Sequence, residues 1–160
     1  MNGPLPRFAP GVLTLLALVV APAARADTAF EARTAVQACL AAVIDGAPVE
    51  DMAIGAVAVH RERNPNLCRV TVSVGAPEEL RAAVDAAAAS RAEGFAPART
   101  AWDPGALASR ETLCNRPGRR ALNLVVETAR PGATPVLTAT VIEGHERDQR
   151  CDLDMGPQRP

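Results

Sequence analysis

The four cysteines are the side chains of this sequence with the widest range of chemistry. A cysteine thiolate can bind a metal ion, exchange electrons within a C-x-x-C motif, or form a disulfide. No two cysteines are spaced as C-x-x-C, and neither His60 nor His145 stands at metal-ligand spacing from a cysteine. We therefore expect disulfides, and we predict no metal and no other cofactor. The cysteines are Cys39, Cys68, Cys114 and Cys151.

Four cysteines allow three pairings, and the sequence alone leaves all three open. The pairing of near neighbours, Cys39 with Cys68 and Cys114 with Cys151, fits the predicted elements best, because each bridge then spans one local unit of the fold. Each bridge would close a loop of about 30 to 40 residues. In the chain-entropy model, such a loop stabilises the folded state by roughly 3 to 4 kcal/mol.

A cluster of arginines precedes the last predicted hairpin. Guanidinium groups hold carboxylates and phosphates through paired hydrogen bonds, so this cluster is a candidate anion-binding site. A solvated turn is the competing interpretation and the commoner role of such arginines. The cluster consists of Arg110, Arg116, Arg119 and Arg120.

The two histidines are the candidate general bases. His60 stands beside Arg61 and Glu62, and His145 stands among acidic residues near the C-terminus. An imidazole in such surroundings can take a proton from a nucleophile or from water. No Ser or Cys nucleophile motif accompanies either histidine, so the pattern favours surface histidines and we predict no catalytic residue.

Residues 1–26 have the organisation of a secretory signal peptide. Arg7 precedes an apolar run at residues 12–20, and Ala24-Arg25-Ala26 provides small residues at signal-peptidase spacing. The apolar run is too short for a membrane-spanning helix, which needs about 20 residues. We expect cleavage after Ala26 and a periplasmic or secreted protein with no membrane span. The mature chain should form one domain over residues 27–155, followed by a disordered tail at 156–160.

Composition narrows the class of partner. All 17 basic residues are arginines, and loss of Arg7 and Arg25 with the signal peptide leaves 15 against 18 acidic residues, a net charge of −3. A domain of this charge is not expected to bind nucleic acid.

Aromatic residues make up only 2% of the chain, so Ala, Val, Leu and Ile must fill the core.

Two long helices are indicated by the residues at their ends. Thr28 and Glu31 form a capping box, which predicts the start of the first helix, and Gly46 predicts its end. Pro77 at a first helical position, followed by two acidic residues, predicts the second helix, which Gly94 ends.

Alternating or continuous apolar residues indicate strands. The turn signals Arg116-Pro117-Gly118 and Arg130-Pro131-Gly132 stand on either side of one of them. A short helix is expected ahead of the first turn, at residues 103–113. The predicted strands, which pair as two antiparallel hairpins, are residues 52–59, 67–74, 119–128 and 136–143.

The order of these elements predicts an α+β fold. Two successive αββ units should form a four-stranded antiparallel sheet, packed by helices on one face and stapled by the disulfides. With a signal peptide, disulfides and no catalytic motif, the sequence indicates an exported, non-enzymatic binding or structural module of the cell envelope. Its partner would be an envelope or secreted protein. Two alternatives stay open: an inhibitor of a secreted enzyme acting through the turn at residues 116–120, and a small hydrolase using His145 or His60.

Overall fold

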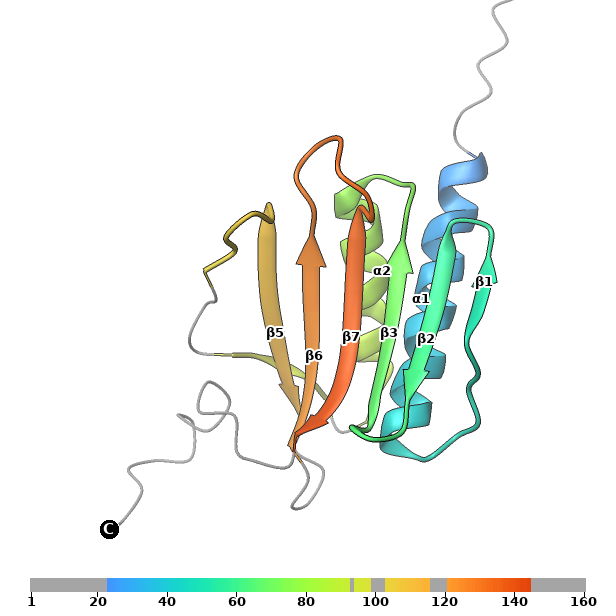
Figure 1. The fold of residues 1–160 in the computed structure, drawn as a ribbon, viewed down its shortest axis with the longest axis vertical. Coiled ribbons are helices and arrows are strands. Elements are labelled where there is room, and N and C mark those ends of the chain that lie inside the picture. The colour runs from blue at the N-terminus through green and yellow to red at the C-terminus, as the bar shows by residue number, and fades with distance from the viewer. Residues whose placement is uncertain (1–22, 93, 99–102, 116–120, 145–160) are drawn as a thin grey trace, which may run out of the picture.

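The computed structural model of the chain describes residues 23–92, 94–98, 103–115 and 121–144, and for residues 23–26 it describes the backbone only (Figure 1). Several predicted features lie outside the described residues. These are the cleavage region up to residue 22, the C-terminal tail, Cys151, His145, Arg116, Arg119 and Arg120.

The described residues form two helices and one antiparallel sheet. The predicted α+β class is therefore confirmed. The predicted number of four strands is wrong, because the sheet has seven strands in the order β1-β2-β3-β7-β6-β5-β4. In chain order the elements are α1 (Ala23–Ile44), β1 (Met52–Ile54), β2 (Val57–Glu62), β3 (Leu67–Val72), α2 (Pro77–Ala89), β4 (Ala96–Pro97), β5 (Ser109–Asn115), β6 (Ala121–Thr128) and β7 (Leu137–Gly144).

Each helix is followed by its own run of antiparallel strands. Strands β1 to β3 follow α1, and strands β4 to β7 follow α2. The two runs join through their last strands, β3 and β7, where Val70 lies opposite Ala139. The predicted alternation of a helix with strands is thus kept, but with more strands in each unit than the two expected.

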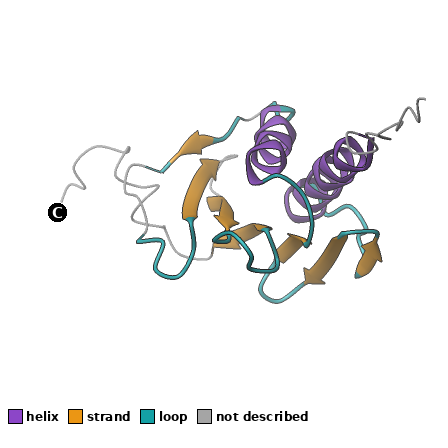
Figure 2. Ribbon diagram, turned by 90° about the horizontal axis from the view of Figure 1, so that it is seen from above, coloured by secondary structure: helices purple, strands orange, loops and turns teal. Residues whose placement is uncertain are grey.

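Both helices lie on the same face of the sheet, as predicted (Figures 1 and 2). Helix α1 packs on β2, β3 and β7, and α2 packs beside α1 and against β7. Between these layers the largest fully buried side chains are all leucines and valines, among them Leu40, Leu80, Leu124 and Val70. An aliphatic core is what the shortage of aromatic residues implies.

Helix α1 begins earlier than the sequence predicts. It starts at Ala23 instead of Thr28, so Thr28 and Glu31 lie inside the helix and the predicted capping box is wrong. Alanine and arginine, which fill residues 23–26, both favour helix and extend it. The predicted end is right, because the helix stops at Ile44 and Gly46 has a left-handed φ of 72°.

Residues 52–59 were expected to form one buried strand, and this prediction is wrong. The chain reverses at Gly55, which has a φ of 56°, and the segment becomes the antiparallel pair β1 and β2. Met52 then lies opposite Val59, and Ile54 lies opposite Val57. The turn needs only one residue with positive φ, which Gly55 supplies, so the apolar residues continue through it and the sequence shows no break there.

A short helix is predicted at residues 103–113, and this prediction is also wrong, because residues 109–115 are extended. They form strand β5, in which Leu113 lies opposite Leu124 of β6. Pairing with β6 provides hydrogen-bond partners for the backbone N–H and C=O groups of both strands. This pairing outweighs the weak helix preference of the segment.

The disulfide between Cys39 and Cys68 joins α1 to β3, and it is the first of the two pairings favoured from the sequence. Both residues are fully buried, and their Cα atoms lie 5.3 Å apart. Cys114 is also disulfide-bonded. Its predicted partner, Cys151, lies outside the described residues.

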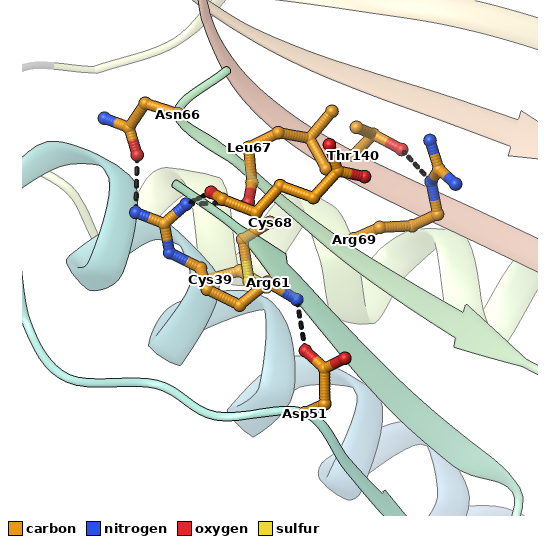
Figure 3. Close-up of a disulfide and its surroundings, with 9 residues drawn as sticks. Cys39, Asp51, Arg61, Asn66, Leu67, Cys68, Arg69 and Thr140 are labelled. Carbon is orange, nitrogen blue, oxygen red and sulfur yellow. Dashed lines mark hydrogen bonds between the residues drawn. A yellow bond between two sulfur atoms is a disulfide. The ribbon is translucent and has the colours of Figure 1, made fainter. Parts of the chain in front are cut away.

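A network of hydrogen bonds surrounds this disulfide (Figure 3). The guanidinium of Arg61 donates to the carbonyl oxygens of Glu62 and Leu67 and to Oδ1 of Asn66. The amide of Asn66 donates in turn to the Val43 carbonyl oxygen at 3.1 Å and to Oε2 of Glu143 at 2.7 Å. The turn between β2 and β3 is thereby tied to the end of α1 and to β7.

Candidate binding surface

His60 lies on β2, on the face of the sheet opposite the helices. Its Nδ1 atom is 2.8 Å from Oδ2 of Asp51, and its Nε2 atom is 3.2 Å from Oε1 of Glu62. The hydrogen bond to Asp51, and then the charge of Asp51, raise the pKa of His60. The pKa of Asp51 is lowered, first by the hydrogen bond from the Arg61 backbone N–H and then by the one from His60.

This arrangement suits a charged imidazolium more than a general base. Each ring nitrogen of His60 faces a carboxylate, so no nitrogen is left to accept a proton from a nucleophile. His60 therefore gives no support to the hydrolase alternative. His145, the other histidine of that alternative, lies outside the described residues.

Arg110 is the one member of the predicted arginine cluster that the structure describes. It lies on β5, and its Nε atom forms an ion pair with Oε1 of Glu127 on the neighbouring strand at 2.8 Å. Together with Arg69 and three threonines, these two side chains line a shallow hollow of about 530 Å³ on the outer face of the sheet. Arg110 is thus paired with Glu127, and since Arg116, Arg119 and Arg120 lie outside the described residues, anion binding by the cluster stays a prediction.

An apolar groove lies on the helix side of the sheet, between α1 and the edge strand β1. Its volume is about 600 Å³. The α1 side is made largely of small residues, Thr34, Ala35 and Ala38, which let another element approach the helix closely. The sheet side is formed by alternate residues of β1 and β2, which face the helices because side chains alternate along a strand. These residues are Met52, Ile54, Val57 and Val59.

The exposed apolar side chains gather around this groove. Among the described residues, the large hydrophobic side chains that are exposed are Phe30 (70%), Met52 (50%), Ile54 (57%) and Val74 (61%). The first three all line the groove, whereas Val74 does not. Isolated exposed hydrophobic residues are ordinary, but a group of them around one hollow marks a binding surface.

Two carboxylates stand on the rim of the groove. Glu31 and Glu50 are the charged residues among the described residues that line it, and both are acidic. Glu31 lies beside the turn between β1 and β2, since a Cβ atom placed on Gly55 would be 3.3 Å from Oε2 of Glu31. Glu50 stands just ahead of β1, toward the other end of that strand. Neither carboxylate forms an ion pair or hydrogen bond within the part of the chain that the structure describes.

The groove was not predicted from the sequence. Residues 52–54 were assigned to a buried strand, and Phe30 was assigned no role. One signal was present: Phe30 stands six residues before Val36, which places it about 120° around an α-helix from that core residue. Phe30 thus lies off the buried stripe of α1, although the sequence does not indicate what it faces.

Neither a metal site nor a membrane span is found in the described residues. Among the described residues, no group of three or more His, Cys, Asp or Glu side chains is placed to bind a metal. No described helix combines the length and apolar character needed to cross a membrane. Comparison of the chain with models of protein families, with curated proteins and with solved structures found no match.

Proposed function

We propose that the chain is an exported, non-enzymatic binding module and that the groove between α1 and β1 is its binding surface. The observation that carries this proposal is the convergence of Phe30, Met52 and Ile54 on one groove. Leaving three such side chains in water is unfavourable, at roughly 25 cal/mol per Å² of apolar surface, and a partner that covers them recovers that free energy.

The Cys39–Cys68 disulfide supports the exported location, because disulfides persist in oxidising compartments such as the periplasm and the extracellular space. The signal peptide predicted at residues 1–26 points the same way. A non-enzymatic role also agrees with the surroundings of His60, because each of its ring nitrogens is hydrogen-bonded to a carboxylate and none is left to act as a general base.

Photo-crosslinking in the exporting cells tests the proposal. A photoreactive amino acid is placed at position 54, within the groove, and in a matched protein at position 74. Both positions are exposed, at 57% and 61%, but only the first borders the groove. We expect a discrete crosslinked protein from position 54 that is absent from position 74.

The substitution Ile54→Thr, compared with Val74→Thr, supplies the control. Each variant exchanges an exposed β-branched aliphatic residue for threonine, which is β-branched and polar, so neither should disturb the fold. With the photoreactive residue moved to position 52, Ile54→Thr should reduce the crosslink and Val74→Thr should leave it unchanged. Equal crosslinking from positions 54 and 74, or none from either, would contradict the proposal.

A further inference from the structure

We infer that the groove binds an amphipathic helix of a partner protein, and that basic residues flank the apolar face of that helix. This inference rests on the function proposed above, and it adds the chemistry and the shape of the partner. Three features of the groove lead to it: the vacancy in the helical layer, the small residues of α1 and the two rim carboxylates.

The vacancy lies over β1. The two described helices stand side by side and pack on β2, β3 and β7, whereas β1 is the strand at the edge of the sheet, next to β2 (Figure 1). Met52 and Ile54 point to the helix side and are half exposed, so the two described helices leave an apolar surface of the sheet uncovered there. A third helix placed beside α1 would continue the layer and cover both side chains.

The shape of the groove favours a helix over an added strand. A strand that paired with the free edge of β1 would lie in the plane of the sheet and would leave the space between α1 and β1 unfilled. Strand β1 also offers only three residues for pairing. A helix instead enters the groove from the helix side, where Ala35 and Ala38 permit the short separation at which helices pack.

The charges of the rim favour basic residues on the partner. The carboxylates of Glu31 and Glu50, which have no partner among the described residues, attract cations and would repel an acidic helix. Glu50 and Gly55, beside which Glu31 lies, are five positions apart, a length of roughly 16 Å at a strand rise of 3.3 Å, so the two charges stand toward opposite ends of that length. At 1.5 Å per residue, a helix spans that distance in about 11 residues. The partner should therefore carry Arg or Lys about three turns apart, with its apolar stripe between them.

A displayed library of 16-residue peptides tests this chemistry directly. The library fixes apolar residues at helical spacing and randomises the other positions, and it is selected against the mature protein with its disulfides intact. A parallel selection uses the double variant Phe30→Ala, Ile54→Thr, whose exposed substitutions should leave the fold unchanged by circular dichroism. We expect the wild-type selection to enrich peptides with two basic residues about 11 positions apart, and the variant selection to lose them.

One selected peptide then measures the contribution of each rim charge. Glu31→Gln and Glu50→Gln should each weaken binding by about two- to five-fold, as expected for exposed ion pairs, and raising the salt to about 0.5 M should act in the same direction. Glu79→Gln is the matched control, because Glu79 is an exposed glutamate on α2 that does not line the groove. It should leave the affinity unchanged.

Several outcomes would overturn the inference. These are enrichment of peptides without basic flanks, equal enrichment on the double variant, or no enrichment at all. A dimer in sedimentation that Phe30→Ala dissolves would also overturn it, since a second copy of the chain would then occupy the groove. If crosslinking from position 54 persists in cells while the peptides fail, the proposed function stands and only the chemistry of the partner is wrong. If both fail, the groove is not a binding surface.

Discussion

At the level of single residues, His60 shows how an exposed histidine can be held in its charged form. Asp51 accepts from its ring at 2.8 Å and also from the Arg61 backbone N–H at 2.7 Å, so the carboxylate is fixed in place by the chain itself. Such an arrangement links the loop before β1 to β2 through charge, at the surface and without a buried ion pair.

The substitution Asp51→Asn should lower the pKa of His60 toward its ordinary value of 6.5, because it removes the larger of the two carboxylate contributions. NMR titration of the His60 ring protons measures this directly. Glu62→Gln is the matched control and should lower the pKa by less, since Glu62 contributes less than Asp51. An unchanged pKa in Asp51→Asn would show that the contact is absent in solution.

The His60–Asp51 pair also makes the free energy of unfolding depend on pH. The raised pKa of His60 means that its contribution to stability is complete below pH 6.5 and is lost as the pH rises through the pKa in the folded protein. The lowered pKa of Asp51 gives a contribution that is present above pH 3.8 and is lost on acidification through the folded pKa. The interaction should therefore be strongest between these limits. Asp51→Asn should reduce the loss of stability that the pair causes above pH 6.5 and below pH 3.8, as measured by the free energy of unfolding over that pH range.

The side chain of Asn66 forms hydrogen bonds that link α1, β2 and the residue Glu143 of β7. Asn66→Ala should destabilise the protein by about 1 to 3 kcal/mol, because it removes hydrogen bonds to Arg61, to Glu143 and to the Val43 carbonyl oxygen, two of which involve charged groups. Urea unfolding measures the change. Asn64→Ala, an exposed position in the same turn, should change stability by less than about 0.5 kcal/mol. Equal effects of the two substitutions would contradict the role given to Asn66.

Among the elements, the turn at Gly55 decides the shape of the groove, because it folds residues 52–54 back against β2. Gly55→Ala should cost roughly 1 to 2 kcal/mol, the usual penalty for an alanine in the left-handed region. Chemical denaturation measures this cost. Gly132→Ala is the control, because Gly132 also has a positive φ, of 85°, and has no atom within 4 Å of an added Cβ. It should cost a similar amount, and a neutral Gly55→Ala would contradict the left-handed turn.

The elements that the sequence predicts correctly are those whose local signals agree with their tertiary surroundings. Helix α2 has Pro77 at its start and acidic residues in its first turn, although it ends at Ala89 and not at Gly94 as predicted. Strand β6 alternates as Leu122, Leu124 and Val126 toward the core. The β2–β3 and β6–β7 hairpins follow from alternation and from short connections. In each case the periodicity of the apolar side chains and the residues at the ends of the segment predict the same secondary structure.

The elements that were missed lack such agreement. Strand β5 contains one buried aliphatic residue, Leu113, beside the polar Thr112 and Asn115, so no apolar period announces it. A weaker signal was available, since the Pro117-Gly118 turn signal implies a strand before it as well as after it. The groove could not be predicted, because it depends on Phe30 of α1 lying beside Met52 and Ile54 of β1. No local sequence pattern indicates which residues of two different elements will be close in space.

For the whole molecule, the Cys39–Cys68 bridge is a covalent link between the helical layer and the sheet. Its 29-residue separation corresponds to about 3 to 4 kcal/mol in the chain-entropy model, a large share of the stability of a small domain. Cys39→Ser with Cys68→Ser should lower the free energy of unfolding by that amount in urea under non-reducing conditions. Cys39→Ala with Cys68→Ala should lower it similarly, because the effect belongs to the lost link. A loss below about 1 kcal/mol in both pairs would show that the bridge contributes little.

The order of strands in the sheet has a consequence for export. Strand β7, the last strand in the described chain, is also the central strand of the sheet, between β3 and β6. A chain that crosses a membrane from its N-terminus delivers α1, β1, β2 and β3 first, and the edge of β3 stays unpaired until residues 137–144 emerge. During that interval the nascent chain exposes a row of free backbone donors and acceptors to its neighbours. In the export proposed above, translocation of the final strand is therefore the step that closes the sheet and ends the period in which the chain is open to aggregation.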